Sequence, residues 1–175
     1  MSAPRYDRPD AAEHLEYYGR YIALVPDGDL LRTLEQQDED TMALLAPVPE
    51  SKGDFAYAPG KWTLKEVIGH VADAERVFSY RALRIARADQ TPLPGFDEKT
   101  WVPYAGCAGR TLADLLGELR AVRAGTLALL RHLPPDATTR RGTASNAAIS
   151  VRALAWIIAG HERHHLGIIR ERYLA

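Results

Sequence analysis

A run of mostly apolar residues spaced in alternating steps of three and four most restricts how this chain can fold. The run lies between Thr111 and the Pro-Pro-Asp stretch at 134–136 and has no interruption. This spacing places its members on one face of an α-helix, whereas a strand would require alternation with a period of two. Such a stripe is typical of a helix that packs in a bundle. Its members are Leu112, Leu115, Leu119, Val122, Thr126, Leu129 and Leu133.

Three more segments show helical periodicity, at about 29–46, 63–89 and 150–173. The second begins with a T-x-x-E capping box formed by Thr63 and Glu66. No segment predicts a strand. Four amphipathic helices of this length predict an all-α fold, a four-helix bundle. The apolar seam of the last helix contains two histidines among its members, which are Val151, Leu154, Ile158, His161, His165 and Ile168.

The chain divides into an N-terminal arm, residues 1–28, and a bundle domain, residues 29–175. Within the arm, the stretch AAEHLEYYGRYIALV can form a short extra helix. We expect three of its tyrosines to pack it onto the bundle, namely Tyr17, Tyr18 and Tyr21.

Two longer connections, about 90–110 and 134–149, are rich in Pro, Gly and small polar residues. Long loops in compact domains are often lids or binding loops. The first connection contains more aromatic side chains than a linker needs. We therefore expect Phe96, Trp101 and Tyr104 to cover a functional cleft.

Composition narrows the possible functions. The 175 residues suit a single domain. The 22 Lys+Arg and 23 Asp+Glu give a formal net charge of −1, so charge provides no general reason to bind nucleic acid or an anionic membrane. The single cysteine, Cys107, excludes an internal disulfide framework and a cysteine-based zinc cluster. The sequence shows neither an apolar run of ~20 residues nor the apolar region of a signal peptide, so we expect a cytoplasmic protein.

Three of the six histidines lie in the octapeptide GHERHHLG, residues 160–167. His161 and His165 are four residues apart on the predicted seam, so their Cβ atoms lie about 5–6 Å apart on one helix face. Two imidazoles placed in this way can bind one ion at ~2.0–2.1 Å from each ring nitrogen. Because burying imidazoles costs free energy unless their nitrogens find partners, a shared metal ion would account for both positions.

The same octapeptide satisfies the H-E-x-x-H pattern of zinc metalloprotease helices. Such proteases take their third ligand downstream of the second histidine. Here the downstream sequence, LGIIRERYLA, contains no histidine, and its only carboxylate side chain is that of Glu171. That residue lies six positions after His165 and therefore points away from the ligand face. We reject the protease interpretation.

A third ligand must then come from upstream. His14 lies in the arm, and His132 lies off the seam at the end of its helix, where a cationic side chain complements the helix dipole. His70 lies on the apolar stripe of the second helix. We therefore predict a metal site formed by His70, His161 and His165, with at least one open coordination position, as in catalytic zinc sites. The alternative for His70 is a hydrogen-bonded core residue.

Three residues near the predicted site keep two interpretations each, whereas for a fourth, Cys107, the sequence favours one. Glu162 is either a general base or a partner in a surface salt bridge. His164, one position off the seam, supports the site or lies on the surface. Asp73 either orients the imidazole of His70 or is an exposed carboxylate. Cys107 is an incidental loop thiol rather than a nucleophile, because no histidine or second cysteine lies near it in sequence.

Three stretches, APGKWTLKEVIGHVADAERVFSYRALRIARAD, TPLPGFD and GHERHHLGIIRERY, resemble the DinB-like superfamily of damage-inducible four-helix bundle proteins. The likeness covers about residues 18–173. Its motifs are Trp62 followed by His70, and the later pair His161 and His165. The resemblance implies an up-down-down-up bundle with a long crossover, commonly dimeric. It also implies that these three histidines bind a divalent metal, zinc or nickel.

The resemblance also suggests a reaction. Some members are metal-dependent enzymes that use small thiols, such as bacillithiol S-transferases and mycothiol-dependent maleylpyruvate isomerase. It therefore implies a thiol S-transferase or a related detoxification enzyme, acting on a small thiol and an electrophilic substrate. The alternative is a non-catalytic, metal-stabilised dimer of the stress response. An open coordination position facing a cleft favours the enzyme, whereas a metal ligated entirely by protein favours the structural role.

Overall fold

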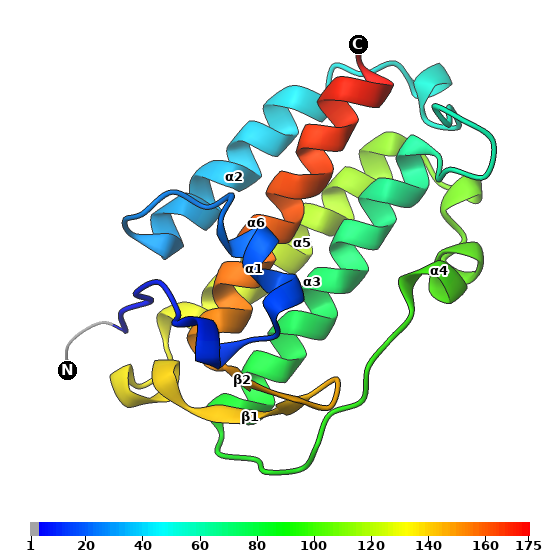
Figure 1. Ribbon diagram of the computed structural model, residues 1–175. Helices are drawn as coiled ribbons and strands as arrows, with labels where there is room; N and C mark the ends of the chain where they lie inside the picture. Colours follow the sequence, from blue (N-terminus) through cyan, green and yellow to red (C-terminus); the bar gives the residue numbers. More distant parts are fainter. Residues whose placement is uncertain (1–3) are drawn as a thin grey trace.

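The computed structural model describes residues 4–175, in which four long helices form the predicted bundle (Figure 1). The helices α2 and α6 run toward one end of the bundle, whereas α3 and α5 run toward the other. The order is therefore up-down-down-up, with a long crossover joining α3 to α5, as the resemblance implied. None of the described helices is long and apolar enough to cross a bilayer. The four helices are α2 (Leu30–Leu45), α3 (Leu64–Ala86), α5 (Leu112–Arg131) and α6 (Val151–Ile168).

Short elements complete the fold. Two of them are α-helices, α1 (Glu16–Ile22) in the arm and α4 (Glu98–Trp101) in the crossover. A π-helical turn, Ile169–Tyr173, extends α6. Five 3₁₀ segments lie at Ala11–Glu13, Glu50–Lys52, Val102–Tyr104, Cys107–Gly109 and Pro135–Thr139 in the described part of the chain.

Side-chain caps fix where the long helices begin. The side chain of Asp29 accepts hydrogen bonds from the backbone N–H groups of the first turn of α2. Thr63 and Glu66 form the predicted capping box at the start of α3. At the starts of α5 and α6, the side chains of Thr111 and Ser150 each accept a hydrogen bond from a backbone N–H of the first turn. These caps satisfy donors that a helix start otherwise leaves without partners.

The prediction that no segment forms a strand was wrong. The second connection folds into an antiparallel hairpin of β1 (Arg141–Ala144) and β2 (Ala147–Ser150). Its two-residue turn, Ser145 and Asn146, has positive φ at both positions (52° and 61°), as in a type I′ hairpin turn. The sequence concealed the hairpin because the strands RGTA and AAIS are short and lack the alternation of apolar and polar residues by which a strand is detected.

A polar layer crosses all four long helices and divides the apolar core into two clusters. One cluster is centred on Trp156 and the other on residues such as Leu64 and Tyr173. The layer consists of five buried polar residues near the boundary between the two clusters. They are Gln37 and Thr41 on α2, Glu75 on α3, Arg123 on α5 and Glu162 on α6.

Arg123 is the centre of this layer and is only 2% exposed. Its guanidinium donates to both carboxylate oxygens of Glu75, at 2.9 and 2.7 Å, and to Glu162 at 2.8 Å. Glu162 also accepts from Gln37 and Thr41, each at 2.7 Å. Both proposed roles for Glu162 were wrong, because it is neither a base in an open site nor part of a surface salt bridge. It joins α6 to α2 and α5 inside the core.

The predicted seam of α5 was correct in outline but missed its charged member. Val122 and Leu129 are only half-buried, whereas Arg123 and Leu130 are fully buried. Helical periodicity assigned only apolar residues to the core face, because an arginine is rarely buried unless it is paired. The carboxylates that pair with Arg123 lie on α3 and α6, so the sequence of α5 alone gave no sign that this arginine is buried.

We expect Arg123→Met to destabilise the fold by about 3–5 kcal/mol, because it leaves two buried carboxylates without their countercharge. Arg120→Met on the same helix is the matched control, since Arg120 is exposed and pairs with Asp38 at 3.0 Å. Its loss should cost no more than about 1 kcal/mol. Urea denaturation measures both values, and equal losses would show that the layer contributes nothing special.

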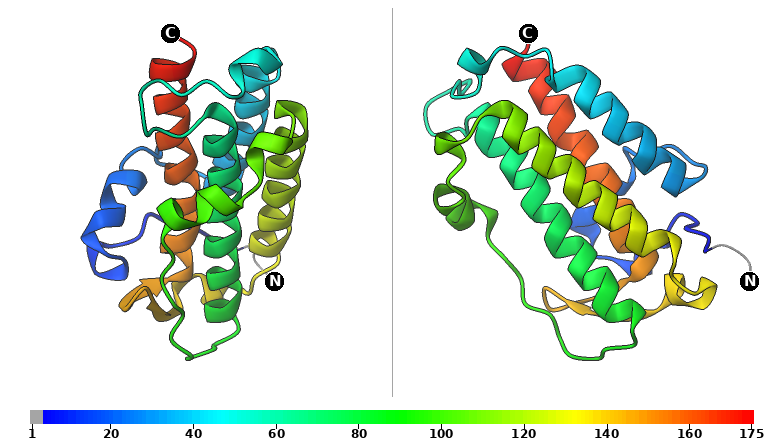
Figure 2. Two further views of the ribbon diagram at one scale, coloured as in Figure 1. Left: turned by 90° about the vertical axis from the view of Figure 1, so that its right-hand side faces the viewer. Right: turned by 180° about the vertical axis from the view of Figure 1, so that it is seen from behind.

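The N-terminal arm contains the predicted short helix, with α1 packed across the middle of α6 (Figures 1 and 2). Of the three tyrosines expected to pack it onto the bundle, Tyr21 is buried and Tyr18 contacts Phe78, whereas Tyr17 is 53% exposed. The approach is close because α6 has Gly160 at the crossing. A Cβ at this position would lie 2.1 Å from the carbonyl oxygen of Tyr21. Only glycine allows the two backbones to approach so closely.

Gly160→Ala should therefore force α1 away from α6 and lower stability by about 1–3 kcal/mol, the usual cost of overpacking. Gly167→Ala is a control in the same helix, because a Cβ there meets nothing within 4 Å. That change should stabilise α6 by roughly 0.5–1 kcal/mol through helix propensity. Thermal melts of the two variants should move in opposite directions, and a neutral Gly160→Ala would contradict the close packing.

Candidate metal centre

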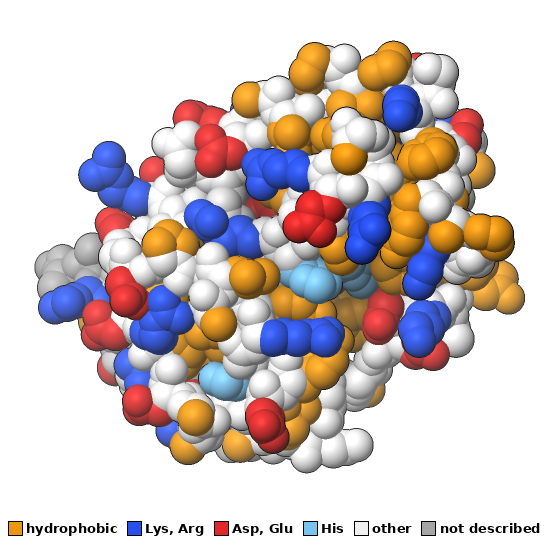
Figure 3. Space-filling view, turned by 45° about the horizontal axis from the view of Figure 1, so that its top comes forward, with side chains coloured by type: hydrophobic (Ala, Val, Ile, Leu, Met, Phe, Trp, Pro, Cys, Tyr) orange, Lys and Arg blue, Asp and Glu red, His pale blue; other side chains and the backbone are white. Residues whose placement is uncertain are grey.

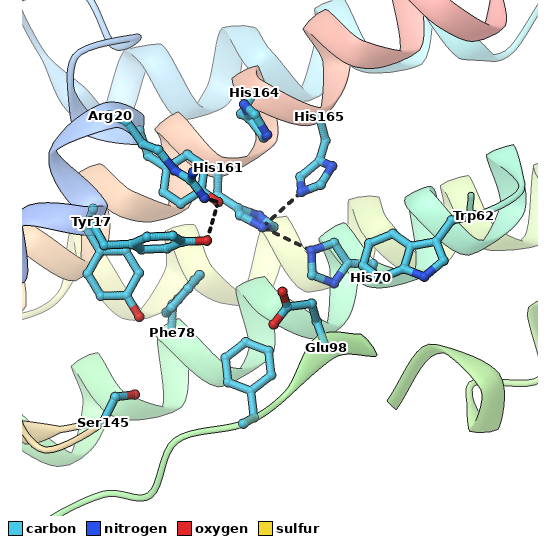
Figure 4. Close-up of a pocket in the computed structure, with 13 residues that line it drawn as sticks. Tyr17, Arg20, Trp62, His70, Phe78, Glu98, Ser145, His161, His164 and His165 are labelled. Atoms are coloured by element: carbon cyan, nitrogen blue, oxygen red, sulfur yellow. Dashed lines mark hydrogen bonds between the residues drawn. The ribbon is translucent and has the colours of Figure 1, made fainter. Parts of the chain in front are cut away.

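Three histidine rings converge where α3 faces α6 (Figure 4). The Nε2 atom of His161 lies 3.1 Å from Nε2 of His70 and 3.2 Å from Nε2 of His165. Ligand atoms of all three residues lie within 4.8 Å of one another. The structure thus brings together the three histidines that the sequence singled out, one from α3 and an i,i+4 pair from α6.

The donor set fits a divalent metal ion. Two nitrogens bound tetrahedrally at ~2.0–2.1 Å lie ~3.3 Å apart, close to the two distances above. Burial lowers the pKa of His70 to about 4 and that of His165 to about 3, and it places the pKa of His161 well below its usual value. At neutral pH the imidazoles are therefore uncharged, the form that ligates metals. Without a metal, a single N–H can form a hydrogen bond between only two of the three facing nitrogens. A bound cation can accept the lone pairs of all three nitrogens.

Aromatic neighbours hold the rings in place. The indole of Trp62 lies against His70, with ring centroids 4.8 Å apart. Tyr21 and Phe78 contact His161 edge-on, at 5.4 and 6.0 Å. The seam positions of the histidines direct them inward, and these neighbours restrict the rotation of their rings.

The other candidates lie outside the cluster or at its edge. The ring of His14 bonds the adjacent backbone, and exposed His132 bonds the last turn of α5, so neither reaches the cluster. Asp73 pairs with an arginine one turn away, at 3.2 Å, rather than with His70. His164 is half-buried beside His165. Cys107 is buried against α3, and burial raises the pKa of its thiol, consistent with an unreactive residue.

The histidine cluster lies in the wall of a cavity of about 360 Å³, called here the first cavity. In Figure 3, histidine side chains are visible from outside in a hollow bordered by hydrophobic, basic and acidic side chains. The cavity is therefore open to solvent. Its walls come from α1, α3, α6, the crossover and the hairpin, and its lining residues are Tyr17, Tyr18, Arg20, Tyr21, Trp62, His70, Phe78, Phe96, Glu98, Ser145, His161, His164 and His165.

The prediction that three aromatic residues of the crossover cover the cleft is correct only for one of them. Phe96 lines it and contacts Phe78 at 6.2 Å. Trp101 lies behind Phe96, with ring centroids 5.0 Å apart, and does not line the first cavity. Tyr104 is 90% exposed, so its predicted role as a cover was wrong. The turn Val102–Tyr104 directs that side chain outward, which sequence composition does not reveal.

Sequence reasoning missed two charged groups in the first cavity. Arg20 stacks on the ring of Tyr17, 3.9 Å from its centroid, and donates to the hydroxyl of Tyr21 at 2.8 Å. Glu98 directs its carboxylate toward the histidines (Figure 4). It has no ion-pair partner among residues 4–175. In the sequence, the only hint that these two charged residues belong to a site is the group of aromatic residues around each of them. The sequence could not show that both segments meet at the histidines, because this depends on the tertiary fold.

The fold and the site together define a class of protein. It is a four-helix bundle of up-down-down-up order in which three inward-facing histidines could hold a metal ion. The family model of the DinB superfamily matches residues 33–169. The chain therefore belongs to the DinB superfamily.

Curated relatives and a solved structure agree with this assignment. The Bacillus subtilis protein named "Putative metal-dependent hydrolase YfiT" is 25% identical over 145 residues, which cover 81% of this chain and 80% of YfiT. The similarly named OB0782 of Oceanobacillus iheyensis is 30% identical over 66% of this chain and 67% of its own length. The structure of YfiT matches with a TM-score of 0.73 and 22% identity, over 93% of this chain and 89% of that chain.

We expect His161→Ala to weaken metal affinity by more than ~100-fold, because loss of a ligand should exceed the 10–100-fold cost of losing a supporting partner. His70→Ala and His165→Ala should act alike. His132→Ala is the matched control, since that ring lies on the exposed end of α5. Metal analysis after dialysis gives the occupancy, and full occupancy in His161→Ala would refute the assignment.

Proposed function

We propose that the protein is a metal-dependent enzyme that transfers a small thiol onto an electrophilic substrate, with zinc or nickel held by His70, His161 and His165. The observation that carries this proposal is the placement of the three converging imidazoles in the wall of an open cavity. Membership of the DinB superfamily and the names of the relatives support a metal-dependent function.

The ligand set supports catalysis rather than a purely structural metal. Among the described residues, the histidine cluster has three members and no fourth protein ligand. Structural zinc sites usually have four protein ligands, whereas catalytic sites have three and one open position. A divalent ion bound here would supply a Lewis acid that favours the deprotonated form of a thiol or of water.

The residues of the chain can perform the remaining tasks. Glu98 is the carboxylate that faces the histidines, so it can accept the thiol proton and pass it to solvent. The sulfur then forms a bond to the electrophilic carbon, whose bond to the leaving group breaks with the electron pair departing on that group. The net products are a thioether and the protonated leaving group. Tyr18, Phe78 and Phe96 provide apolar walls that limit access of water.

Hydrolysis is the second candidate. The names of the relatives favour it, and the same Glu98 could remove a proton from water attacking an ester or amide. Both reactions use one site and differ in the nucleophile. The non-catalytic dimer differs in class, because it predicts no turnover with either nucleophile.

The test is a thiol-consumption assay with metal-loaded protein. Bacillithiol, mycothiol, glutathione and cysteine are each paired with an aryl halide and an epoxide, and ester hydrolysis is followed in parallel. We expect turnover of at least one thiol, its loss on chelation, and its return with zinc or nickel. Hydrolysis alone would favour the second candidate, and no turnover in any assay would favour the non-catalytic dimer.

Glu98→Gln should lower kcat by about 10²–10⁴-fold, the usual range for loss of a general base, while metal content stays unchanged. Glu39→Gln is the control, because Glu39 is exposed on α2 and does not line the first cavity. Steady-state kinetics and metal analysis on the same preparations separate catalysis from metal loss. Unchanged kcat in Glu98→Gln would exclude this residue as the base.

A further inference from the structure

A second cavity, of about 440 Å³, lies beside the histidine cluster. It is formed by the loop before α3, the start of α3, the end of α6 and the crossover. His165 and Trp62 line both cavities, so these two side chains are the wall between them. The histidine cluster can therefore be approached from two sides.

The second cavity has a basic rim and an aromatic wall. Lys61 and Lys99 line it, and its lining includes no acidic residue. Neither lysine has a carboxylate partner within 4 Å in residues 4–175. Tyr57 and Tyr173 meet edge-on at 5.3 Å and form part of the wall.

The neighbouring lysine of α3 differs from the two lysines of the second cavity, because Lys65 is paired with Glu50 at 2.8 Å and with Asp54 at 3.2 Å. Lys61 and Lys99 come from segments far apart in sequence, and the fold brings them to one cavity. Two ammonium groups without countercharges above an aromatic wall match a ligand that has an anionic group and an apolar body.

We propose that the second cavity binds a small organic anion, a carboxylate or a phosphate ester, and presents it to the histidine cluster past His165 and Trp62. This inference rests on the proposed function, since a transfer reaction needs two substrates at one centre. The first cavity then takes one substrate and the second cavity the other. Lys61 and Lys99 act as specificity-determining residues that bind the charged group.

Direct binding tests this proposal without an activity assay. The probes are benzoate and phenyl phosphate, with neutral benzamide as the matched control ligand. Titration calorimetry on the metal-loaded protein gives Kd, and methyl NMR gives the location. Val67 and Ile168 line the second cavity and not the first, so their methyl signals should shift.

We expect Lys61→Ala and Lys99→Ala each to weaken anion binding by about threefold, and the double variant by about tenfold, as for exposed charge pairs. Benzamide should bind equally to all these proteins. Both lysines are exposed, so the variants should fold normally. Lys52→Ala is the matched control, because Lys52 lies on a neighbouring turn over Phe55 and does not line the cavity.

A competing explanation is that the anion binds Arg20 in the first cavity or the metal itself. Loss of affinity in Arg20→Ala but not in the lysine variants would overturn the proposal, as would loss on metal removal alone. Failure of both anions to bind the wild-type protein would also overturn it. Lysine-dependent binding in a protein that shows no thiol turnover would support the second cavity and count against the proposed reaction only.

Discussion

The buried ion cluster of Arg123, Glu75 and Glu162 is the interaction on which the arrangement of the bundle depends. It joins α3, α5 and α6, and Gln37 and Thr41 bring in α2 through Glu162. Charges this deeply buried are costly to separate, so the helices must keep the register in which all of them pair. Glu162 directly follows His161 in α6, and it points toward α2 and α5. The neighbouring imidazole is thereby held on the side that faces α3 and α1.

Two segments outside the four long helices form the cavity around the histidines. The arm contributes Tyr21 and Arg20, and its approach depends on Gly160 in α6. The crossover contributes Phe96 and Glu98. A four-helix bundle without these segments would expose the histidines on its flank. With them, the cluster has apolar walls, one carboxylate and one guanidinium, which are the groups that substrate binding and proton transfer require.

The charges around the histidine cluster are distributed unequally. The first cavity has both Glu98 and Arg20, whereas the second cavity has only the two lysines. A site that joins two molecules needs separate places for each, and unlike electrostatics help to prevent binding in the wrong place. In the proposed enzyme, the two side chains shared by the cavities would have different tasks: His165 would ligate the metal, and the indole of Trp62 would separate the two substrates.

The sequence by itself determined the helices, their caps and the three histidines, because these depend on spacing along one chain. Periodicity located the helices, Thr63 with Glu66 marked a helix start, and seam positions directed His161 and His165 inward. Only the tertiary structure decided what those positions meet. The burial of Arg123, the inward turn of Glu98, the outward turn of Tyr104 and the pairing of the hairpin each depend on partners distant in sequence. Local patterns record which side of a helix is apolar, but the partner of a charged side chain, and hence whether it can be buried, is settled when the helices pack.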